Sequence, residues 1–259
     1  MLRKLIRQLG FDIVKVKNLE EELKRREKER EKRRIQEITE LRNVRLSYQQ
    51  QKVGNFPYLT YVNRDQLKAT ASKLIKDVDS VLDIGCAFRP QNYIESKVHI
   101  CCEPYTQYMD RLIVEKSNNP KYVFVNCDLE GLGKIFPSGS VDSAILNDVI
   151  EHAEKEIGLK ALAALKKIVR QQIIIFTPLG FMPQESDKDE LDPWGMKGTK
   201  FQKHLSGWLP TDFPEEEGWQ IILCEDYHQV DGYGRTLDKP FGAMYAIYNN
   251  FVLNSIKTC

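Results

Sequence analysis

The sequence contains no apolar run that approaches the roughly 20 residues needed for a membrane-spanning helix. It also lacks the apolar segment and small-residue cleavage site that indicate a signal peptide. These two absences make the cytoplasm the expected location. With 259 residues, of which 42% are hydrophobic, the chain can bury one substantial core and still carry an extension.

Residues suited to metal or disulfide chemistry are few. The six cysteines include no C-x-x-C pair, and most lie in segments expected to form strands, where cysteine acts as a small apolar residue. We therefore expect reduced thiols, with neither a zinc site nor a disulfide framework. Only four histidines are present, at positions 99, 152, 204 and 228.

The net charge of +1 conceals an uneven distribution. Residues 1–52 hold 16 Lys and Arg against 9 Asp and Glu, whereas the rest of the chain holds 22 against 28. Residues 19–46 are helix-forming throughout, with i,i+4 pairs at Arg25–Glu29 and Glu29–Arg33. Such a helix could stand in solvent, pack on its own domain, or form a dimeric coiled coil. Nucleic-acid binding is disfavoured because interleaved acids would cancel much of the positive field.

Residues 1–16 form a separate short segment. One helical face of it is apolar, with basic residues elsewhere, and Gly10 is a plausible end of the helix. This pattern is compatible with a peripheral membrane contact or with packing against the domain. A membrane contact would be weak by itself, because so short a helix buries little apolar area.

Residues 81–90 read as a buried strand that ends at a tight turn. Three of residues 81–84 are apolar, as in a strand covered on both faces, and Gly85 permits a sharp turn and close approach of a ligand. Asp83 could accept hydrogen bonds from an ammonium group but would repel a pyrophosphate. The turn therefore favours a cofactor that carries an amino acid.

This segment resembles the first motif of class I S-adenosylmethionine-dependent methyltransferases, Asp/Glu-x-Gly-x-Gly-x-Gly. Asp83 and Gly85 match the motif, whereas Ala87 and Arg89 stand at its second and third glycines. The resemblance implies that Gly85, Cys86 and Ala87 lie against the cofactor. The two missing glycines imply a loop that sits slightly further from it.

Three later segments fall in the order that this family requires. Residues 98–103 read as a second strand, and the family uses an acid at the position of Glu103 to bind the ribose hydroxyls. Residues 122–128 read as a third strand, and the resemblance places Asp128 and the backbone of Leu129 at the adenine ring.

A fourth strand is expected at residues 141–146. The string that follows it, Asn147-Asp-Val-Ile-Glu-His152, resembles the motif at this place in many small-molecule methyltransferases, where it implies cofactor contacts from Asn147 and Asp148. Ligands of open α/β sheets gather at the carboxyl ends of the strands, so we expect the four strand ends to form one site.

The rest of the chain fits the same fold. Apolar residues in 158–169 recur with helical spacing, and 172–178, 219–224 and 243–248 read as further strands. Over roughly residues 60–250, the resemblance implies an α/β fold, a doubly wound seven-stranded sheet of the Rossmann-like methyltransferase type. The sheet is expected to be mostly parallel, with an antiparallel last strand.

The expected organisation has two parts. Residues 1–52 would form the helical extension and residues 53–259 the methyltransferase domain, with a lid at 179–214 that has no strong period. The lid carries apolar and aromatic side chains that could face a sugar, an aromatic ring or the core: Phe181, Met182, Trp194, Phe201 and Trp208.

Methyl transfer to a hydroxyl needs a positioned acceptor and a proton acceptor, for which a neutral imidazole is suitable. We favour His204, on the expected lid, as base or acceptor anchor, with His152 as its neighbour and Asp148 completing the catalytic set. His99, inside a strand, is expected to be structural. His228, expected in the link between the last two strands, is a reserve candidate.

A metal site is an alternative. Some methyltransferases carry an acid-x-x-Glu-His cluster with a distant His that binds a divalent cation, and Asp148, Glu151, His152 and His204 could form one. The same letters occur in methyltransferases that use no metal, so no metal ligand is predicted.

The expected activity is therefore transfer of a methyl group from S-adenosylmethionine to an oxygen of a small molecule or glycan, leaving S-adenosylhomocysteine. The Gln-x-His-x-Ser-Gly-Trp208 string and the basic N-terminal helix resemble methyltransferases of surface-polysaccharide or glycolipid assembly. Two alternatives stay open. One is a non-catalytic scaffold of the same fold, and the other is an NAD-binding oxidoreductase, disfavoured because no Gly-x-Gly-x-x-Gly follows the first strand.

Overall fold

The computed structural model of the chain describes residues 58–184 and 191–250, and six helical residues of the N-terminal extension: Lys24, Arg25, Lys28, Glu29, Lys32 and Gln36. The chain divides into two units, residues 1–50 and 51–259. The predicted pair Arg25–Glu29 is present, with Nε and Oε1 3.9 Å apart. The predicted segment 1–16 and the rest of the helix predicted over residues 19–46 lie outside the described residues. Within the described ranges, no helix is both long and apolar enough to cross a bilayer.

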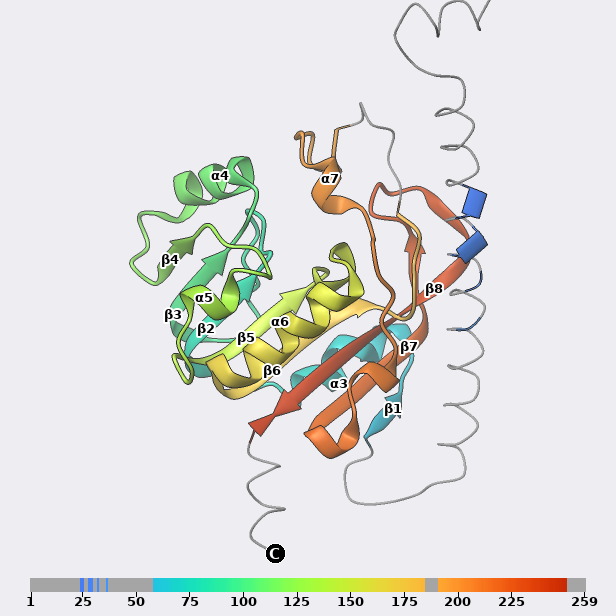
Figure 1. The fold of residues 1–259 in the computed structure, drawn as a ribbon, viewed down its shortest axis with the longest axis horizontal. Helices are drawn as coiled ribbons and strands as arrows, with labels where there is room; N and C mark the ends of the chain where they lie inside the picture. The colour runs from blue at the N-terminus through green and yellow to red at the C-terminus, as the bar shows by residue number, and fades with distance from the viewer. Residues whose placement is uncertain are drawn as a thin grey trace, which may run out of the picture. The chain divides into compact units, whose positions relative to one another are not determined.

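Eight strands form one sheet in the order β1-β7-β8-β6-β5-β2-β3-β4 (Figure 1). The strands are β1 Leu59–Tyr61, β2 Val78–Ile84, β3 Ser96–Cys102, β4 Tyr122–Val125, β5 Val141–Asn147, β6 Val169–Pro178, β7 Trp219–Val230 and β8 Thr236–Asn249. Strand β8 is antiparallel to both β6 and β7, and the other neighbours are parallel. The predicted mostly parallel sheet with an antiparallel last strand is confirmed. The predicted count of seven is wrong, because β1 adds an edge strand beside β7.

Short helices cover both faces of the sheet, as a doubly wound fold requires. They are α3 Leu67–Ser72, α4 Thr106–Lys116, α5 Leu132–Ile135, α6 Lys155–Ile168 and α7 Thr199–Gln202, with 3-10 turns η1 Arg64–Gln66, η2 Ile150–His152, η3 Pro210–Asp212 and η4 Glu215–Glu217. In Figure 1, α6 lies in front of the sheet and α3 behind it. The helical stripe predicted within 158–169 buries Leu162, Leu165 and Ile168, whereas Leu159 and Ala163 of the same prediction are exposed.

The central strands read as apolar runs because helices cover both of their faces. Residues 144–146 of β5 and 173–175 of β6 are fully buried. From β2 the chain continues outward through β3 and β4, and then returns to the other side of β2 with β5 and β6. This reversal leaves a crevice outside the carboxyl ends of β2 and β5, which is where ligands bind in such sheets.

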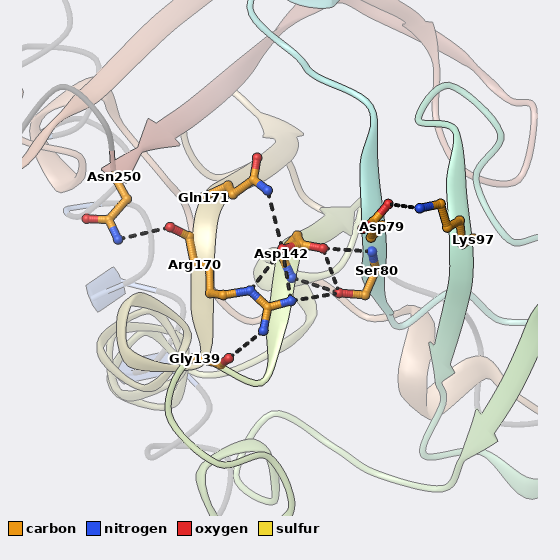
Figure 2. A network of polar contacts seen from close by, with 8 residues as sticks. All are labelled: Asp79, Ser80, Lys97, Gly139, Asp142, Arg170, Gln171 and Asn250. Atoms are coloured by element: carbon orange, nitrogen blue, oxygen red, sulfur yellow. Dashed lines mark hydrogen bonds and ion pairs between the residues drawn. The ribbon is translucent and has the colours of Figure 1, made fainter.

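At the opposite, amino-terminal edge, a polar network joins β2, β5 and β6 (Figure 2). One carboxylate oxygen of Asp142 accepts hydrogen bonds from the backbone N–H and the hydroxyl of Ser80, both at 2.9 Å. The other accepts from Nε of Arg170, also at 2.9 Å. An exposed ion pair, Lys97–Asp79 at 2.8 Å, flanks the network on β3 and β2. These contacts hold the starts of the central strands together.

The segment expected to be a lid, 179–214, is described over residues 179–184 and 191–214, and residues 185–190 lie outside the described part of the chain. Trp208 and Phe213 are fully buried, and Trp208 packs against Gly158 of α6. Trp208 also bridges to Leu179 and Gly180 through isolated β-bridges. Of the three surroundings left open for Trp208, a sugar, an aromatic ring or the core, the structure shows the core, where the ring packs over the helical residue Gly158.

Candidate active site

A cavity of about 740 Å³ opens at the carboxyl ends of the strands. Its wall contains every residue predicted for the cofactor or for catalysis: Asp83, Gly85, Cys86, Ala87, Glu103, Asp128, Leu129, Asn147, Asp148, His152 and His204. His228, the reserve candidate, also lines it. The structure thus brings side chains from four strand ends and from 179–214 to one place, and their roles remain predictions.

The turn after β2 is tight. Gly85 has φ +63°, and an added Cβ there would lie 2.7 Å from a methyl carbon of Val149, in the loop that follows β5. Ala87 also adopts a left-handed conformation, with φ +48°, which is unfavourable for a residue with a Cβ. The loop therefore keeps a positive φ where the family motif has its second glycine. In the described structure no helix follows before β3 begins at Ser96.

Asp83 is held by a buried histidine. Its Oδ2 lies 2.9 Å from Nε2 of His99 on β3 and accepts the backbone N–H of Gln91, also at 2.9 Å. Burial raises the pKa of Asp83, and the contacts with His99 and Gln91 oppose that rise. His99 is structural, as expected, but its particular role is to position a carboxylate of the cavity wall.

Glu103 follows β3 and is only 3% exposed. Its two carboxylate oxygens accept the backbone N–H groups of Ala87 and Tyr105, each at 2.9 Å. Burial raises the pKa of Glu103 to about 7, against the opposing effect of these two hydrogen bonds. The side chain thus ties the turn of β2 to the end of β3 while facing the cavity.

Asp128 lies at the rim of the cavity. Its side chain is exposed, and Oδ1 accepts the backbone N–H of Gly131 at 2.9 Å. This hydrogen bond closes the turn that leads into α5. Beside it, Asn126 donates from Nδ2 to the carbonyl oxygen of Glu103 at 2.9 Å. The ends of β3 and β4 are therefore fixed to each other through an amide side chain.

Asp148 directly follows β5 and has φ +53°, an unusual backbone for a residue other than glycine. The protein around its carboxyl raises its pKa to about 7 through desolvation. Because the side chain is exposed to the space of the cavity, this rise is largest when water is excluded from the cavity. Asn147 donates from Nδ2 to Oδ2 of Asp148 at 3.2 Å.

Glu151 is a buried residue of the cavity wall. Its backbone carbonyl oxygen accepts the N–H groups of Leu205 and Ser206, at 2.7 and 3.1 Å, so it fixes the segment that carries His204. Its Oε2 accepts the hydroxyl of Thr177 at 3.0 Å, and Oε1 is buried without a hydrogen-bond partner. Burial, followed by the charge of Asp148, raises the pKa of Glu151 well above its usual value.

The rings of His152 and His204 are adjacent, with centroids 4.8 Å apart. Each ring places Nδ1 near a main-chain carbonyl oxygen, 3.2 Å from that of Lys203 for His152 and 2.6 Å from that of Met182 for His204. Burial lowers the pKa of His152 to about 3, with a further contribution from His204, and burial also lowers the pKa of His204. Both imidazoles are therefore neutral at pH 7, and because a lowered pKa makes an imidazole a weaker base, they suit the role of an anchor or a ligand better than that of a base.

Three groups in the cavity wall could hold a metal ion. One ligand atom each from Glu151, His152 and His204 lie within 4.8 Å of one another.

His228 lies within β7 rather than in the predicted link, because β7 and β8 extend beyond the core as a polar hairpin. Burial lowers the pKa of His228 to about 4, and its Nε2 is buried without a partner.

Aromatic side chains form the outer wall. Trp194 and Phe201 line the cavity, and Tyr108 packs edge-on against Trp194 with centroids 5.2 Å apart. Asp192 organises this wall because its carboxylate accepts the hydroxyl of Tyr108 and the backbone N–H groups of residues 194, 196 and 198. Lys200 adds a cation to the lining.

Sequence reasoning did not identify Gln91 as a site residue. It lines the cavity, its Nε2 is buried without a partner, and its backbone holds Asp83. It lies eight residues after Asp83 in an irregular loop, so no periodic pattern marks it. Only the folded structure shows that Gln91 contacts the carboxylate of Asp83 and lines the cavity.

A comparison with protein-family models finds no match for the sequence, and one with curated proteins finds none. Solved structures that match include the N-methyltransferase NodS from Bradyrhizobium japonicum WM9, at 13% identity and a TM-score of 0.47, over 72% of this chain and 93% of that one. A SAM-dependent methyltransferase from Archaeoglobus fulgidus matches at 16% identity and a TM-score of 0.45, over 73% and 95%. At such low identities and TM-scores, function has to be judged from the residues of the site.

Proposed function

We propose that the chain is an S-adenosylmethionine-dependent methyltransferase that methylates an oxygen of a small molecule or glycan. The observation that carries the proposal is that β2, β3, β4 and β5 each deliver a polar group to one cavity at the topological switch point. Chains that bind a nucleotide phosphate at such a turn use the N-terminus of the helix that follows it, and in the described structure no helix lies between β2 and β3.

The residues of the cavity suit an adenosyl ligand with an amino-acid tail. Glu103 would accept the ribose hydroxyls, because its carboxylate faces the cavity and retains lone pairs beyond the two that bind backbone N–H groups. Asp83 would bind the ammonium group of the tail. The unpartnered Nε2 of Gln91 would donate a hydrogen bond to the carboxylate of the cofactor's amino-acid tail. Asp128 and the backbone of Leu129 would contact the adenine.

S-adenosylmethionine supplies an electrophilic methyl group on a sulfonium. An acceptor hydroxyl loses its proton as its oxygen is methylated, and Asp148 is placed to receive that proton because its carboxyl faces the cavity. A carboxyl whose pKa lies near 7 is an efficient base at neutral pH. His152 and His204, held by carbonyl oxygens, would orient the acceptor as hydrogen-bond acceptors. Trp194 and Phe201 offer faces on which a sugar ring could stack.

Calorimetric titration of the full chain with S-adenosylhomocysteine tests the proposal. We expect binding in the wild type, a loss of at least 30-fold in affinity for Glu103→Ala, and unchanged affinity for Glu95→Ala, which removes an exposed acid outside the cavity. Binding of NAD in place of S-adenosylhomocysteine would make the chain an oxidoreductase. Binding of neither nucleotide would leave a scaffold that has kept only the fold, and either result overturns the proposal.

A further inference from the structure

Glu151, His152 and His204 form a compact group at the inner end of the cavity. One nitrogen of each imidazole and one carboxyl oxygen of Glu151 lie within 4.8 Å of one another. Glu151 and His152 come from the turn η2 after β5, whereas His204 comes from the segment after α7. The main-chain hydrogen bonds from Leu205 and Ser206 to the carbonyl oxygen of Glu151 lock these two segments together. The group is therefore built by the fold rather than by chance proximity on a surface.

The hydrogen bonds of the two histidines fix which nitrogens are available. A carbonyl oxygen can only accept, so Nδ1 donates in both rings, to Lys203 in one case and to Met182 in the other. In that tautomer Nε2 carries the lone pair. Histidines that bind metals commonly donate their other N–H to a carbonyl or carboxylate in this way, which holds the ring in position.

Glu151 supplies the third observation. Its side chain is 1% exposed, and Oε2 accepts the hydroxyl of Thr177 while Oε1 is buried without a hydrogen-bond partner. A buried carboxyl oxygen without a partner is costly, and a native fold seldom keeps one unless a ligand or ion completes it. When Glu151 is ionised, as a metal ligand must be, Oε1 and the two Nε2 lone pairs are three acceptors with no donor among them.

We infer that Glu151, His152 and His204 bind a first-row transition-metal dication. Two imidazoles and one carboxylate are the ligand set that suits Mn²⁺, Co²⁺, Ni²⁺ or Zn²⁺, whereas Mg²⁺ and Ca²⁺ prefer oxygen ligands alone. Three protein ligands leave coordination positions that face the cavity. Where the proposed methyl transfer holds, these positions would receive an oxygen of the acceptor, which narrows the substrate to hydroxyl-bearing compounds that can bind a metal.

The test uses the full chain, freed of metal with a chelator and titrated with Co²⁺ alone, followed by calorimetry and by visible absorption. We expect saturation at one Co²⁺ per chain and a rise in the thermal unfolding midpoint, because the ion binds only the folded state. His204→Gln and Glu151→Gln should each weaken Co²⁺ binding at least tenfold. Mg²⁺ should bind at least tenfold more weakly than Co²⁺.

His228→Gln is the matched control, since it removes an imidazole of the same cavity that lies outside the group. It should change Co²⁺ affinity less than twofold. Equal losses in His228→Gln and His204→Gln, or one-to-one binding that persists in the His152→Gln/His204→Gln double variant, would overturn the inference, as would the absence of saturable binding. The thermal unfolding midpoint of each metal-free variant shows whether it is folded, and S-adenosylhomocysteine affinity measured without metal tests the proposed function separately.

Discussion

The two ends of the sheet each bury a carboxyl group, and the protein shifts the pKa values of these two groups in opposite directions. Asp142, at the amino-terminal edge, and Glu103, at the carboxyl-terminal edge, are 5% and 3% exposed. Burial would raise the pKa of Asp142, but hydrogen bonds from Arg170 and Ser80 outweigh it and lower the pKa below the usual value. Glu103 accepts only two backbone N–H groups, and burial raises its pKa to about 7. The two carboxyl groups therefore differ in having or lacking a guanidinium partner. With Arg170 beside it, ionised Asp142 stabilises the fold, whereas burial disfavours the ionised form of Glu103.

The difference extends beyond these two residues. At the carboxyl-terminal edge, Glu151 and His228 each keep a buried polar atom without a partner, and Asp148 and Ala87 have positive φ angles. Unpartnered groups and backbone strain tend to gather where a ligand binds, because the ligand completes them. Near the amino-terminal edge the buried unpartnered atoms are the neutral hydroxyls of serines 96, 140 and 143, whereas the charge of Asp142 is paired with Arg170.

The largest effect is expected from breaking the amino-terminal network. Asp142→Ala removes the carboxylate that accepts four hydrogen bonds, two from Ser80, one from Arg170 and one from Gln171. Since the guanidinium is half exposed and can be rehydrated, we expect a loss of about 3 kcal/mol in the free energy of unfolding, measured with urea. S-adenosylhomocysteine affinity should stay within twofold, because the cavity is at the other edge.

Lys97→Ala is the control for this measurement. Its ion pair with Asp79 is exposed on both sides and screened by solvent, so its removal should leave the free energy of unfolding unchanged within the error of the measurement. A comparable loss in both variants would mean that the strand starts are generally fragile. The contrast between the two edges would then have no basis in the Asp142 network.

The second prediction concerns pH. Glu103 has a folded pKa near 7, above its unfolded value of 4.5, so folding favours its protonated form. Its contribution is therefore lost as pH rises from 4.5 through 7, while that of Asp142 is lost as pH falls through its lowered pKa. Between pH 5 and pH 8, Glu103→Gln should lose about 2 kcal/mol less stability than the wild type.

The comparison needs the difference between two pH values rather than the stability at one. In Glu103→Gln, the amide that faces the N–H of Ala87 or Tyr105 changes the free energy of unfolding by an amount that does not depend on pH. Parallel stability curves for the wild type and Glu103→Gln would show that Glu103 is ionised in the empty cavity. The proposed contrast with Asp142 would then be lost.

Much of the fold could be predicted from the sequence because the central strands are covered on both faces. The apolar runs at β2, β5 and β6 and the helical spacing in α6 follow directly from that burial. Strand β1 was missed because three residues are too few to show a pattern. The outer parts of β7 and β8, which form a polar hairpin beyond the core, lack the apolar signal that identified their inner halves.

The site was predictable where its residues follow a strand and hidden where they depend on register. Glu103 and Asp148 each stand directly after a strand, so their meeting at one edge follows from parallel pairing. The contact of His99 with Asp83 requires knowing that the two side chains meet across β2 and β3. The orphaned oxygen of Glu151 depends on distant segments, which no local pattern encodes.

The smallest effect tests how closely the two loops of the cavity edge are packed. Gly85→Ala places a Cβ at φ +63° and 2.7 Å from Val149, so it should cost about 1.5 kcal/mol of stability from backbone strain and contact together. Val149→Ala removes the two methyl carbons that the new Cβ meets. The double variant should therefore recover the contact part, a coupling of about 0.5–1 kcal/mol in a double-mutant cycle, but not the strain. Simple additivity would show that the loops after β2 and β5 move apart freely, and the cavity edge would then be adaptable rather than preformed.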